Sequence, residues 1–394
     1  MSKPIYLDNQ STTPMDPLVL NAMLPFFKEK FGNASSIHHP YGLEAKDAVE
    51  KARLVLAKSI KAQEREIIFT SGATEAINLA IKGVAAKYKK THHIITQSTE
   101  HSAVIDTCNS IKRKGWSVVN VPVDNHGLVD PKTILNSINS QTVLVAIMHA
   151  NNEIGSIQPI KEIGKICKDR DIIFFVDACQ SYGKLDLNVE EMNINMLAVT
   201  GHKIYGPKGI GFLYVSQKKP KIDLEMQIDG GGHERGYRSG TLSVPLIVGF
   251  AKAVEISEKR RKSENLKLKK LRDCLYYGIK NAHPDVILNG SFDNRLNHNL
   301  NVCFPDIDAE TIVMKTEGIA CSIGSACGSM ERKPSHVLKA LGYSNELAHS
   351  AIRFSLGRFN TMEEINRSIE IINETVKHIK VKKIKRKSRF FNKV

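Results

Sequence analysis

The sequence predicts an α/β protein with a large domain built on a mainly parallel seven-stranded sheet and a smaller α+β domain. Short apolar runs alternate with amphipathic, helix-like stretches up to about residue 245, which indicates βαβ units. After that point a long charged helix and shorter strands replace the alternation. The chain has 394 residues, of which 42% are hydrophobic, so it can bury a sizeable core. This composition excludes a largely disordered protein.

Seven strands are expected in the large domain, and several are almost wholly apolar, as in strands that are covered on both faces. Helices are expected between most of them, for example over Glu75–Lys89 and Ile160–Lys168, where apolar residues recur at helical spacing. The expected strands are Glu66–Thr70, His93–Gln97, Ser117–Val123, Thr142–Met148, Ile172–Val176, Met196–Val199 and Gly211–Val215.

The smaller domain is expected to open with a charged helix over Ala251–Lys280. The change of pattern places the large domain at residues 15–258 and the small domain at 1–14 and 259–380, with a basic tail at 381–394. The strands expected in the small domain are Val286–Leu288, Leu300–Phe304, Ile319–Ser322 and Ile352–Ser355.

The positive charge is concentrated at the C-terminal end. The formal net charge is +15, and nine Lys or Arg residues without any Asp or Glu lie between Lys377 and Lys393. Such a tail can bind an acidic partner or a nucleic-acid backbone. The alternative, which we favour, is a solvated and frayed chain end.

The apolar runs, the first residues and the cysteines of the sequence indicate where the protein resides and whether its thiols are reduced. No apolar run approaches the roughly 18 residues of a membrane-spanning helix. The first residues resemble neither a secretory signal nor a transit peptide. The seven cysteines include no CxxC pair, which disfavours a disulfide framework or a closed zinc site. We therefore expect a cytoplasmic protein without a membrane partner, a mature mitochondrial or other organellar form being the alternative.

Polar residues follow the expected strands, where ligands bind in open α/β sheets. The segment Thr70–Glu75 opens a helix with small and hydroxyl residues, so its backbone N–H groups can cradle a phosphate. An ordinary helix cap is the alternative. Asp177 closes a buried strand, where a carboxylate needs a cationic or hydrogen-bonding partner. Lys203 follows another strand after small and polar residues.

Together these residues fit one cofactor. Pyridoxal phosphate needs a lysine for its Schiff base, a carboxylate for its pyridinium nitrogen and an anion cradle for its phosphate. Asp177 and Lys203 are 26 residues apart, about one βαβ crossover, so both can face one crevice. A nucleotide loop is the rival interpretation of the glycines at 206–211 and 230–236, but neither stretch matches a P-loop or a dinucleotide fingerprint.

Two residues of the small domain carry further chemistry. Cys327 lies among Gly, Ser and Ala residues, which predicts an exposed loop where a thiolate can react. An incidental loop cysteine is the alternative. Arg353 lies inside an expected strand and needs an anionic partner, which is either a substrate carboxylate or a structural ion pair.

The motifs resemble those of the cysteine desulfurases of iron–sulfur-cluster assembly, which are class-V aminotransferase-like enzymes of PLP fold type I. The resemblance runs from about residue 4 to about residue 378, and the order and spacing of all the motifs agree. The segments that carry it are Tyr6–Asp8, Thr70–Glu75, Glu100–His101, Asn151–Gly155, Asp177–Gln180, Gly201–Gly209, Arg238–Thr241 and Gly324–Cys327.

The resemblance implies a role for each matching residue. Lys203 would bind the cofactor and move the Cα proton, Asp177 would hold the pyridinium nitrogen, and His101 would stack on the ring and assist proton transfer. Cys327 would attack the sulfur of bound L-cysteine. Gln180 would contact the ring hydroxyl. Asn152 would contact the cofactor and the substrate carboxylate, and Arg353 would bind the substrate carboxylate. The phosphate would be bound by Ala73, Thr74, Thr200 and His202 and, from the other subunit of a homodimer, by Thr241.

The implied function is conversion of L-cysteine to L-alanine, with a persulfide on Cys327 that passes to acceptors. The implied acceptors are an iron–sulfur scaffold protein and other proteins, including those of tRNA thiolation. Cys327 would also be a transient ligand of a [2Fe–2S] cluster shared with the scaffold. The alternatives are a selenocysteine lyase or another PLP β-lyase, and a cofactor-free protein that binds nucleic acid through its tail. Ser11, Cys179 and the basic C-terminal end depart from the family pattern. In relatives, a C-terminal extension that this basic end replaces helps to dock the scaffold protein.

Overall fold

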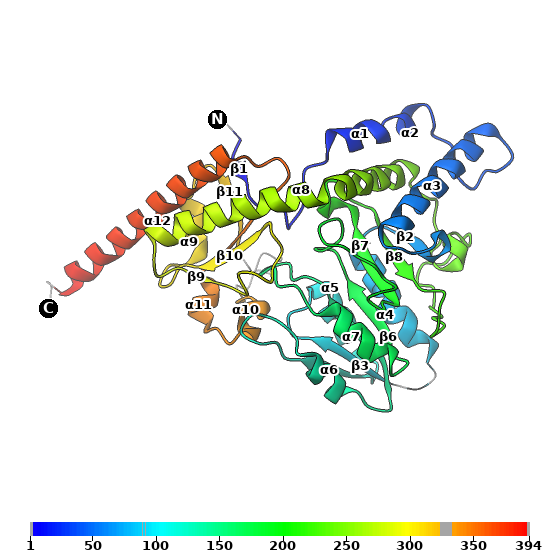
Figure 1. Ribbon diagram of the computed structural model, residues 1–394, viewed down its shortest axis with the longest axis horizontal. Helices are drawn as coiled ribbons and strands as arrows, with labels where there is room; N and C mark the ends of the chain where they lie inside the picture. The colour runs from blue at the N-terminus through cyan, green and yellow to red at the C-terminus, as the bar shows by residue number, and fades with distance from the viewer. Residues whose placement is uncertain (1–2, 89, 91, 324–332, 392–394) are drawn as a thin grey trace.

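The computed structural model describes residues 3–88, 90, 92–323 and 333–391 and is built around one large and one small sheet (Figure 1). The large sheet has the strand order β2-β8-β7-β6-β5-β3-β4. Only β8 runs antiparallel to its neighbours, so the predicted fold class is confirmed. The strands are β2 (Ile67–Thr70), β3 (His93–Gln97), β4 (Ser117–Val121), β5 (Thr142–Met148), β6 (Ile173–Asp177), β7 (Met196–Thr200) and β8 (Gly211–Val215).

The predicted strands differ from these only at their ends. β4 stops at Val121 instead of Val123, because it is an edge strand whose one neighbour, β3, ends at Gln97 opposite Val121. β6 and β7 each extend by one polar residue, to Asp177 and Thr200. Both residues are therefore fixed by the ladder at the carboxyl edge of the sheet.

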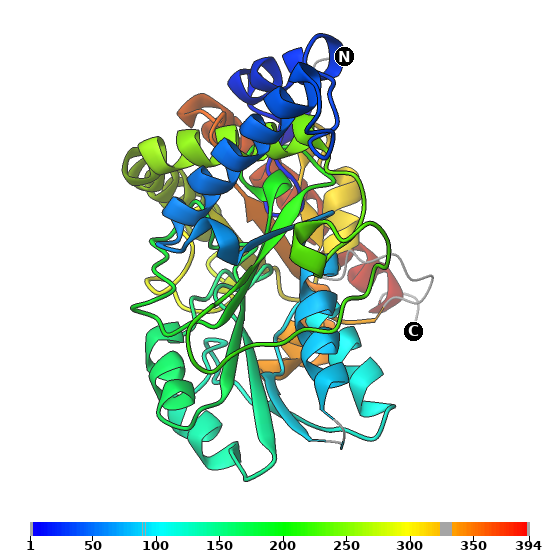
Figure 2. The same cartoon turned by 90° about the vertical axis from the view of Figure 1, so that its right-hand side faces the viewer.

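Helices cover both faces of the large sheet, and alternate strand residues point into two cores. Ile94 packs with α4 (Ala73–Lys87) and α5 (Ser102–Lys112). Its neighbour Ile95 belongs to the opposite core, with α3 (Pro40–Ser59), α7 (Ile160–Lys168) and the first half of α8 (Val244–Ala282). Figure 2 shows these two groups of helices on opposite sides of the strands.

The small sheet has the order β12-β13-β10-β9 and packs with the second half of α8. Its strands are β9 (Ile287–Leu288), β10 (Asn299–Cys303), β12 (Ser322–Ile323) and β13 (Ala351–Ser355). The prediction of one strand over Ile319–Ser322 is wrong. β11 (Ile319–Ala320) pairs with the N-terminal β1 (Ile5–Tyr6), whereas β12 pairs with β13, because the backbone changes partners at Cys321.

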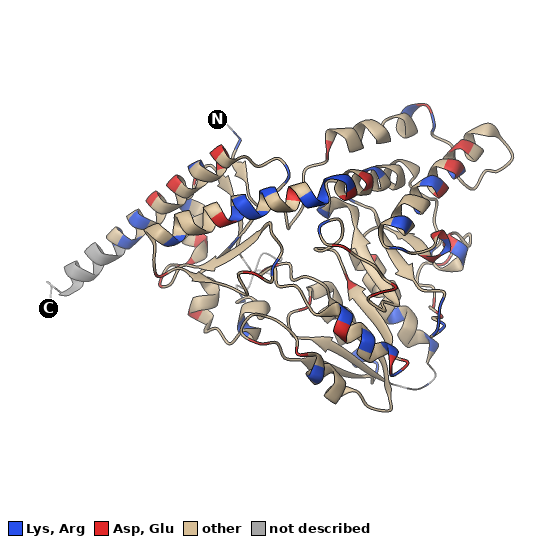
Figure 3. Ribbon diagram, viewed as in Figure 1, with Lys and Arg blue, Asp and Glu red and all other residues tan. Residues whose placement is uncertain are grey.

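α8 joins the two parts of the molecule as one continuous helix. Its residues from Val244 to Ile256 lie in the large core, and those from Leu268 to Ile279 lie in the small core. The predicted boundary at residue 258 falls inside this helix, and the domain bounds stay a prediction. Figure 3 shows charged residues along the stretch of α8 between the two cores.

The C-terminal helix α12 (Met362–Phe391) packs on the small core through Ile365, Ile372 and Val376. It continues through most of the predicted tail, 381–394, and its end projects away from the molecule (Figure 1). In the described part of the chain, no helix combines the length and apolar character of a membrane span. The other helices are α1 (Pro17–Met23), α2 (Pro25–Lys28), α6 (Pro131–Ser137), α9 (Ala309–Lys315), α10 (His336–Ala340) and α11 (Asn345–His349), with 3-10 turns η1 (Glu64–Glu66), η2 (Gly201–Lys203) and η3 (Glu234–Gly236).

Candidate active site

A cavity of about 880 Å³ lies at the carboxyl edge of the large sheet, between this sheet and the small one. The N-terminal segment, β12 and the start of α10 complete its wall. Ten of the predicted site residues line it, namely Ala73, Thr74, His101, Asn152, Asp177, Gln180, Thr200, His202, Lys203 and Arg353. Thr241 does not line it and is exposed in the loop before α8. Cys327 lies outside the described residues.

Lys203 lies in the 3-10 turn η2, directly after β7. Its Nζ donates hydrogen bonds to the backbone carbonyls of Gln10 and Ser11, the second at 2.6 Å. Burial lowers the pKa of Lys203 to about 8, and the charge of Arg353 acts in the same direction. An amine with this pKa is partly neutral near neutral pH, and the neutral amine is the form that attacks a carbonyl carbon.

Asp177 is the last residue of β6 and is buried at the floor of the cavity. Its Oδ1 accepts a hydrogen bond from the backbone N–H of Cys179 at 2.9 Å. The Cys179 thiol also lines the cavity, and burial raises its pKa well above the usual range. Cys179 is therefore a neutral thiol beside Asp177.

His101 caps the N-terminus of α5, because its Nδ1 accepts a hydrogen bond from the Ala103 N–H at 3.1 Å. Since Nδ1 accepts, the proton of the neutral ring is on Nε2. Burial lowers the pKa of His101, while the charge of Asp177 opposes this shift. The ring is thus held in one orientation and one tautomer in the wall of the cavity.

The turn before α4 has the features of an anion cradle. Gly72 has a φ of +153°, which favours glycine, and it provides no capping side chain for the first turn of α4. Residues of this turn line the cavity, as do Thr200 at the end of β7 and the histidine and lysine that follow it. The first N–H groups of a helix have no partner within the helix, so they can bind an anion. An ordinary helix cap, here by Gly72 without a capping side chain, stays the alternative interpretation.

β8 lies very close to the turn before α4. A Cβ on Gly211 would lie 2.4 Å from the Val199 carbonyl oxygen and 2.9 Å from the Gly72 Cα. Only glycine at 211 therefore allows β8 to lie this close to β7 and to the cradle.

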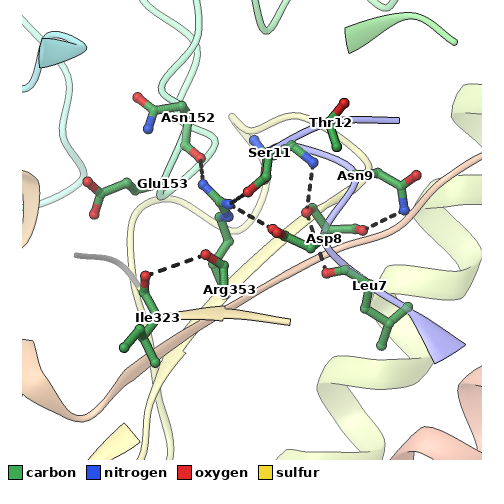
Figure 4. A network of polar contacts seen from close by, with 12 residues as sticks. Leu7, Asp8, Asn9, Ser11, Thr12, Asn152, Glu153, Ile323 and Arg353 are labelled. Carbon is green, nitrogen blue, oxygen red and sulfur yellow. Dashed lines mark hydrogen bonds and ion pairs between the residues drawn. The ribbon is translucent and has the colours of Figure 1, made fainter. Parts of the chain in front are cut away.

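Arg353 is held by three hydrogen bonds at the end of the cavity that faces the small sheet (Figure 4). Its Nη2 donates to the Asp8 carboxylate at 2.8 Å and to the Ser11 hydroxyl at 2.6 Å, and its Nη1 donates to the Asn152 carbonyl at 2.8 Å. The predicted structural ion pair is thus present, with Asp8 as the anion. Nε of Arg353 is buried and has no hydrogen-bond partner among the described residues.

Two amide oxygens in the cavity also lack partners within the described chain. Oδ1 of Asn152 and Oε1 of Gln180 are buried and unpaired, although Nε2 of Gln180 donates to the Gln10 carbonyl at 3.1 Å. A buried polar atom without a partner is costly, so these atoms fit a site that a polar ligand completes. The partly buried lysine, the buried carboxylate, the anion cradle and the unpaired acceptors together fit pyridoxal phosphate.

The sequence motifs did not reveal Gln10 and Ser11 as part of this wall, nor Asp8 as the partner of Arg353. They come from the N-terminal segment, and Asp8 is 345 residues away from Arg353 in the sequence. No local pattern marks such a contact, although an Arg inside a strand did indicate that an anion was needed. Among the described residues, no cluster of three or more His, Cys, Asp or Glu side chains could hold a metal ion. The predicted [2Fe–2S] ligand, Cys327, lies outside the described residues.

Comparison with known proteins identifies the family. The family model described as aminotransferase class-V matches residues 5–367. The chain belongs to the class-V aminotransferase family. It is 48% identical to "Cysteine desulfurase IscS" of Rickettsia typhi, over 94% of this chain and 91% of that protein. It is also 48% identical to "Probable cysteine desulfurase, mitochondrial" of Dictyostelium discoideum, over 96% of this chain and 84% of that protein.

Solved structures agree with this placement. A structure titled "NIFS-LIKE PROTEIN" has a TM-score of 0.89 at 36% identity and covers 95% of this chain and 100% of its own. A structure titled "SspA in complex with cysteine" has a TM-score of 0.79 at 37% identity, with 90% and 99% of the two chains covered. The predicted resemblance to the IscS-type cysteine desulfurases is therefore confirmed.

Proposed function

We propose that this chain is a pyridoxal-phosphate-dependent cysteine desulfurase. It converts L-cysteine to L-alanine and keeps the sulfur as a persulfide on Cys327. The observation that carries the proposal is Lys203, a partly buried amine with a pKa lowered to about 8, in one cavity with Asp177 and Arg353. The 48% identity to cysteine desulfurases supports the substrate.

The cofactor's parts match separate groups of residues. The phosphate fits the first turn of α4, at Ala73 and Thr74, with Thr200 and His202 close by. Asp177 would hold the pyridinium nitrogen, the unpaired Gln180 amide would bind the ring hydroxyl, and His101 would contact the ring. When bound, pyridoxal phosphate withdraws electrons and so stabilises negative charge at the substrate Cα.

The residues of this chain supply binding and proton transfer. Arg353 and the Asn152 amide orient the substrate carboxylate, and the unpaired Arg353 Nε is available for this contact. The Lys203 amine takes the Cα proton and returns a proton to the product. The neutral His101 ring holds its proton on Nε2, where it can donate.

The sulfur transfer balances without any other reactant. The Cys327 thiolate attacks the substrate sulfur, an S–S bond forms and the Cβ–S bond breaks. The electron pair stays on the substrate and takes up a proton. The products are L-alanine and the Cys327 persulfide. An acceptor thiolate then attacks the outer sulfur, an S–S bond to the acceptor forms, the S–S bond to Cys327 breaks, and Cys327 returns to the thiol. An iron–sulfur scaffold protein is the proposed acceptor, with Cys327 as a transient [2Fe–2S] ligand, and proteins of tRNA thiolation are further acceptors.

The chain is proposed to work as a homodimer, in which Thr241 reaches the phosphate of the other subunit. Thr241 is exposed and outside the cavity of its own chain, as this role requires. Large apolar side chains are exposed along the chain from α1, through α2 and the connection that follows it, to the start of α3, and exposed apolar surface of this kind is typical of an interface. They include Leu18, Leu20, Leu24, Phe27, Phe31, Ile37, Tyr41 and Leu43. Light scattering should give twice the chain mass, and Phe31→Lys should lower it.

A cytoplasmic or organellar location is proposed from the relatives, which include bacterial proteins and one named as mitochondrial. Supply of persulfide to acceptors inside the cell agrees with it.

The decisive experiment compares wild-type protein with Cys327→Ala and Lys203→Ala. Wild type should release alanine from L-cysteine and carry one extra sulfur on the Cys327 peptide. Cys327→Ala should keep the cofactor and lose turnover in the presence of a thiol reductant, and Lys203→Ala should lose borohydride trapping of the cofactor. Full turnover by Cys327→Ala would instead support a lyase that needs no protein thiol.

A further inference from the structure

The start of α10 contacts the turn between β3 and α5, which carries His101. Ser335 caps α10 and donates its hydroxyl proton to Oε2 of the buried Glu153 at 2.5 Å. The next residue, His336, places its Nε2 2.8 Å from the backbone carbonyl oxygen of Glu100. Both Ser335 and His336 line the cavity. Two adjacent residues of the small part of the molecule thus bind two residues of the large part beside the cofactor site.

The direction of the His336 bond follows from its partner. A carbonyl oxygen only accepts, so Nε2 of His336 donates in either charge state. Glu100 is fixed from its other side as well, because its buried Oε1 accepts from the Gln97 amide at 2.8 Å and from the Met148 N–H at 2.6 Å. The peptide group between Glu100 and His101 therefore lies between the large sheet and α10.

We propose that His336 is a positioning residue for His101: its hydrogen bond to the Glu100 carbonyl, with the Ser335–Glu153 bond beside it, fixes the turn that directs the His101 ring into the cavity. The inference rests on the proposed function, because His101 is the residue assigned to the cofactor ring. His336 itself touches neither cofactor nor substrate in this role.

The electrostatic surroundings agree with this arrangement. Burial lowers the pKa of His101, and the charges of Lys203 and His336 act in the same direction, against those of Asp177 and Asp106. The lowered pKa of His101 agrees with a neutral ring, and the His336 contact holds the turn that carries this ring in place.

Three variants separate a positioning role from general damage. His336→Leu removes the donor, and His336→Gln keeps an N–H donor on a side chain of similar reach. His378→Leu is the matched control, because His378 also donates a ring N–H to a backbone carbonyl, that of Glu374 at 2.9 Å, but lies exposed on α12. The readout is the rate at which diethyl pyrocarbonate modifies His101 in cofactor-free protein, followed by mass spectrometry of the His101 peptide.

Loss of one hydrogen bond should release the turn and speed this modification by about twofold to tenfold in His336→Leu. His336→Gln and His378→Leu should match wild type. In loaded enzyme, His336→Leu should lower kcat with little change in KM for L-cysteine. Equal labelling of His336→Leu and wild type, or failure of His336→Gln to restore the wild-type rate, would overturn the proposal.

A folding failure does not remove the test. If His336→Leu is insoluble, Ser335→Ala removes the companion bond to Glu153 and should also speed labelling of His101, and an unchanged rate would contradict the inference. Wild-type protein that turns over no cysteine would refute the proposed function, whereas wild-type turnover with unchanged labelling in the variants would refute only the role of His336.

Discussion

The pH dependence of Lys203 gives a quantitative test of the site. Burial lowers the pKa of this amine from 10.5 to about 8. Near pH 7, an amine with a pKa of about 8 is neutral in roughly one molecule in ten, against about three in ten thousand for the unshifted amine. Lys203 should therefore react about 300 times faster than an exposed lysine of equal intrinsic reactivity.

The assay is competitive labelling of cofactor-free protein with trace acetic anhydride, followed by mass spectrometry of the lysine peptides. Because only the neutral amine reacts, labelling of Lys203 should rise about tenfold per pH unit and level off above about pH 8. Arg353→Gln removes a cation that lowers the pKa of Lys203, so the break should move to higher pH. Asp177→Asn removes an anion that raises the pKa, so it should move the break the other way. A labelling rate of Lys203 that shows no break near pH 8 and keeps rising up to the pH at which ordinary lysines lose their proton would refute this reasoning.

Three further predictions concern binding and stability. Arg353→Gln should raise KM for L-cysteine by roughly tenfold to a hundredfold in steady-state kinetics, because charged hydrogen bonds are lost; an unchanged KM would remove Arg353 from substrate binding. Arg53→Met should lower the free energy of unfolding by about 3–5 kcal/mol in urea titrations, because it leaves the buried Glu234 carboxylate without its partner at 2.8 Å. The control Lys252→Ala, in an exposed ion pair, should change the free energy of unfolding by less than about 0.5 kcal/mol. Equal effects of the two substitutions would count against a stabilising role of the buried pair. Gly211→Ala should cost about 1–3 kcal/mol and weaken cofactor retention in dialysis, because its Cβ would lie 2.4 Å from the Val199 carbonyl oxygen; normal retention would mean that β8 shifts freely.

The sequence alone predicts best those strands, helices and strand ends that local hydrophobic periodicity marks. The apolar run before Asp177 and the small, polar turn before Lys203 each mark the end of a buried strand. Because parallel strands end at the same edge, the sequence alone places both residues in one crevice. The same reasoning locates Thr74 at the start of α4.

Contacts between distant segments are out of reach of such patterns. Asp8 pairs with Arg353 across 345 residues, and the split of residues 319–323 into β11 and β12 depends on which strand lies beside each piece. The helix expected over Ala251–Lys280 is present within α8, but the sequence does not reveal that its two halves enter two different cores. Such features are fixed by tertiary packing, which periodicity in one segment does not encode.

The cavity around Lys203 is proposed to bind L-cysteine so that the sulfur of this substrate is transferred to Cys327. The most direct measurement is mass spectrometry of the Cys327 peptide after one turnover with L-cysteine, with alanine measured in the same sample. One added sulfur atom for each alanine formed is the predicted result. Alanine without sulfur on Cys327, or pyruvate and sulfide in place of alanine, would contradict it.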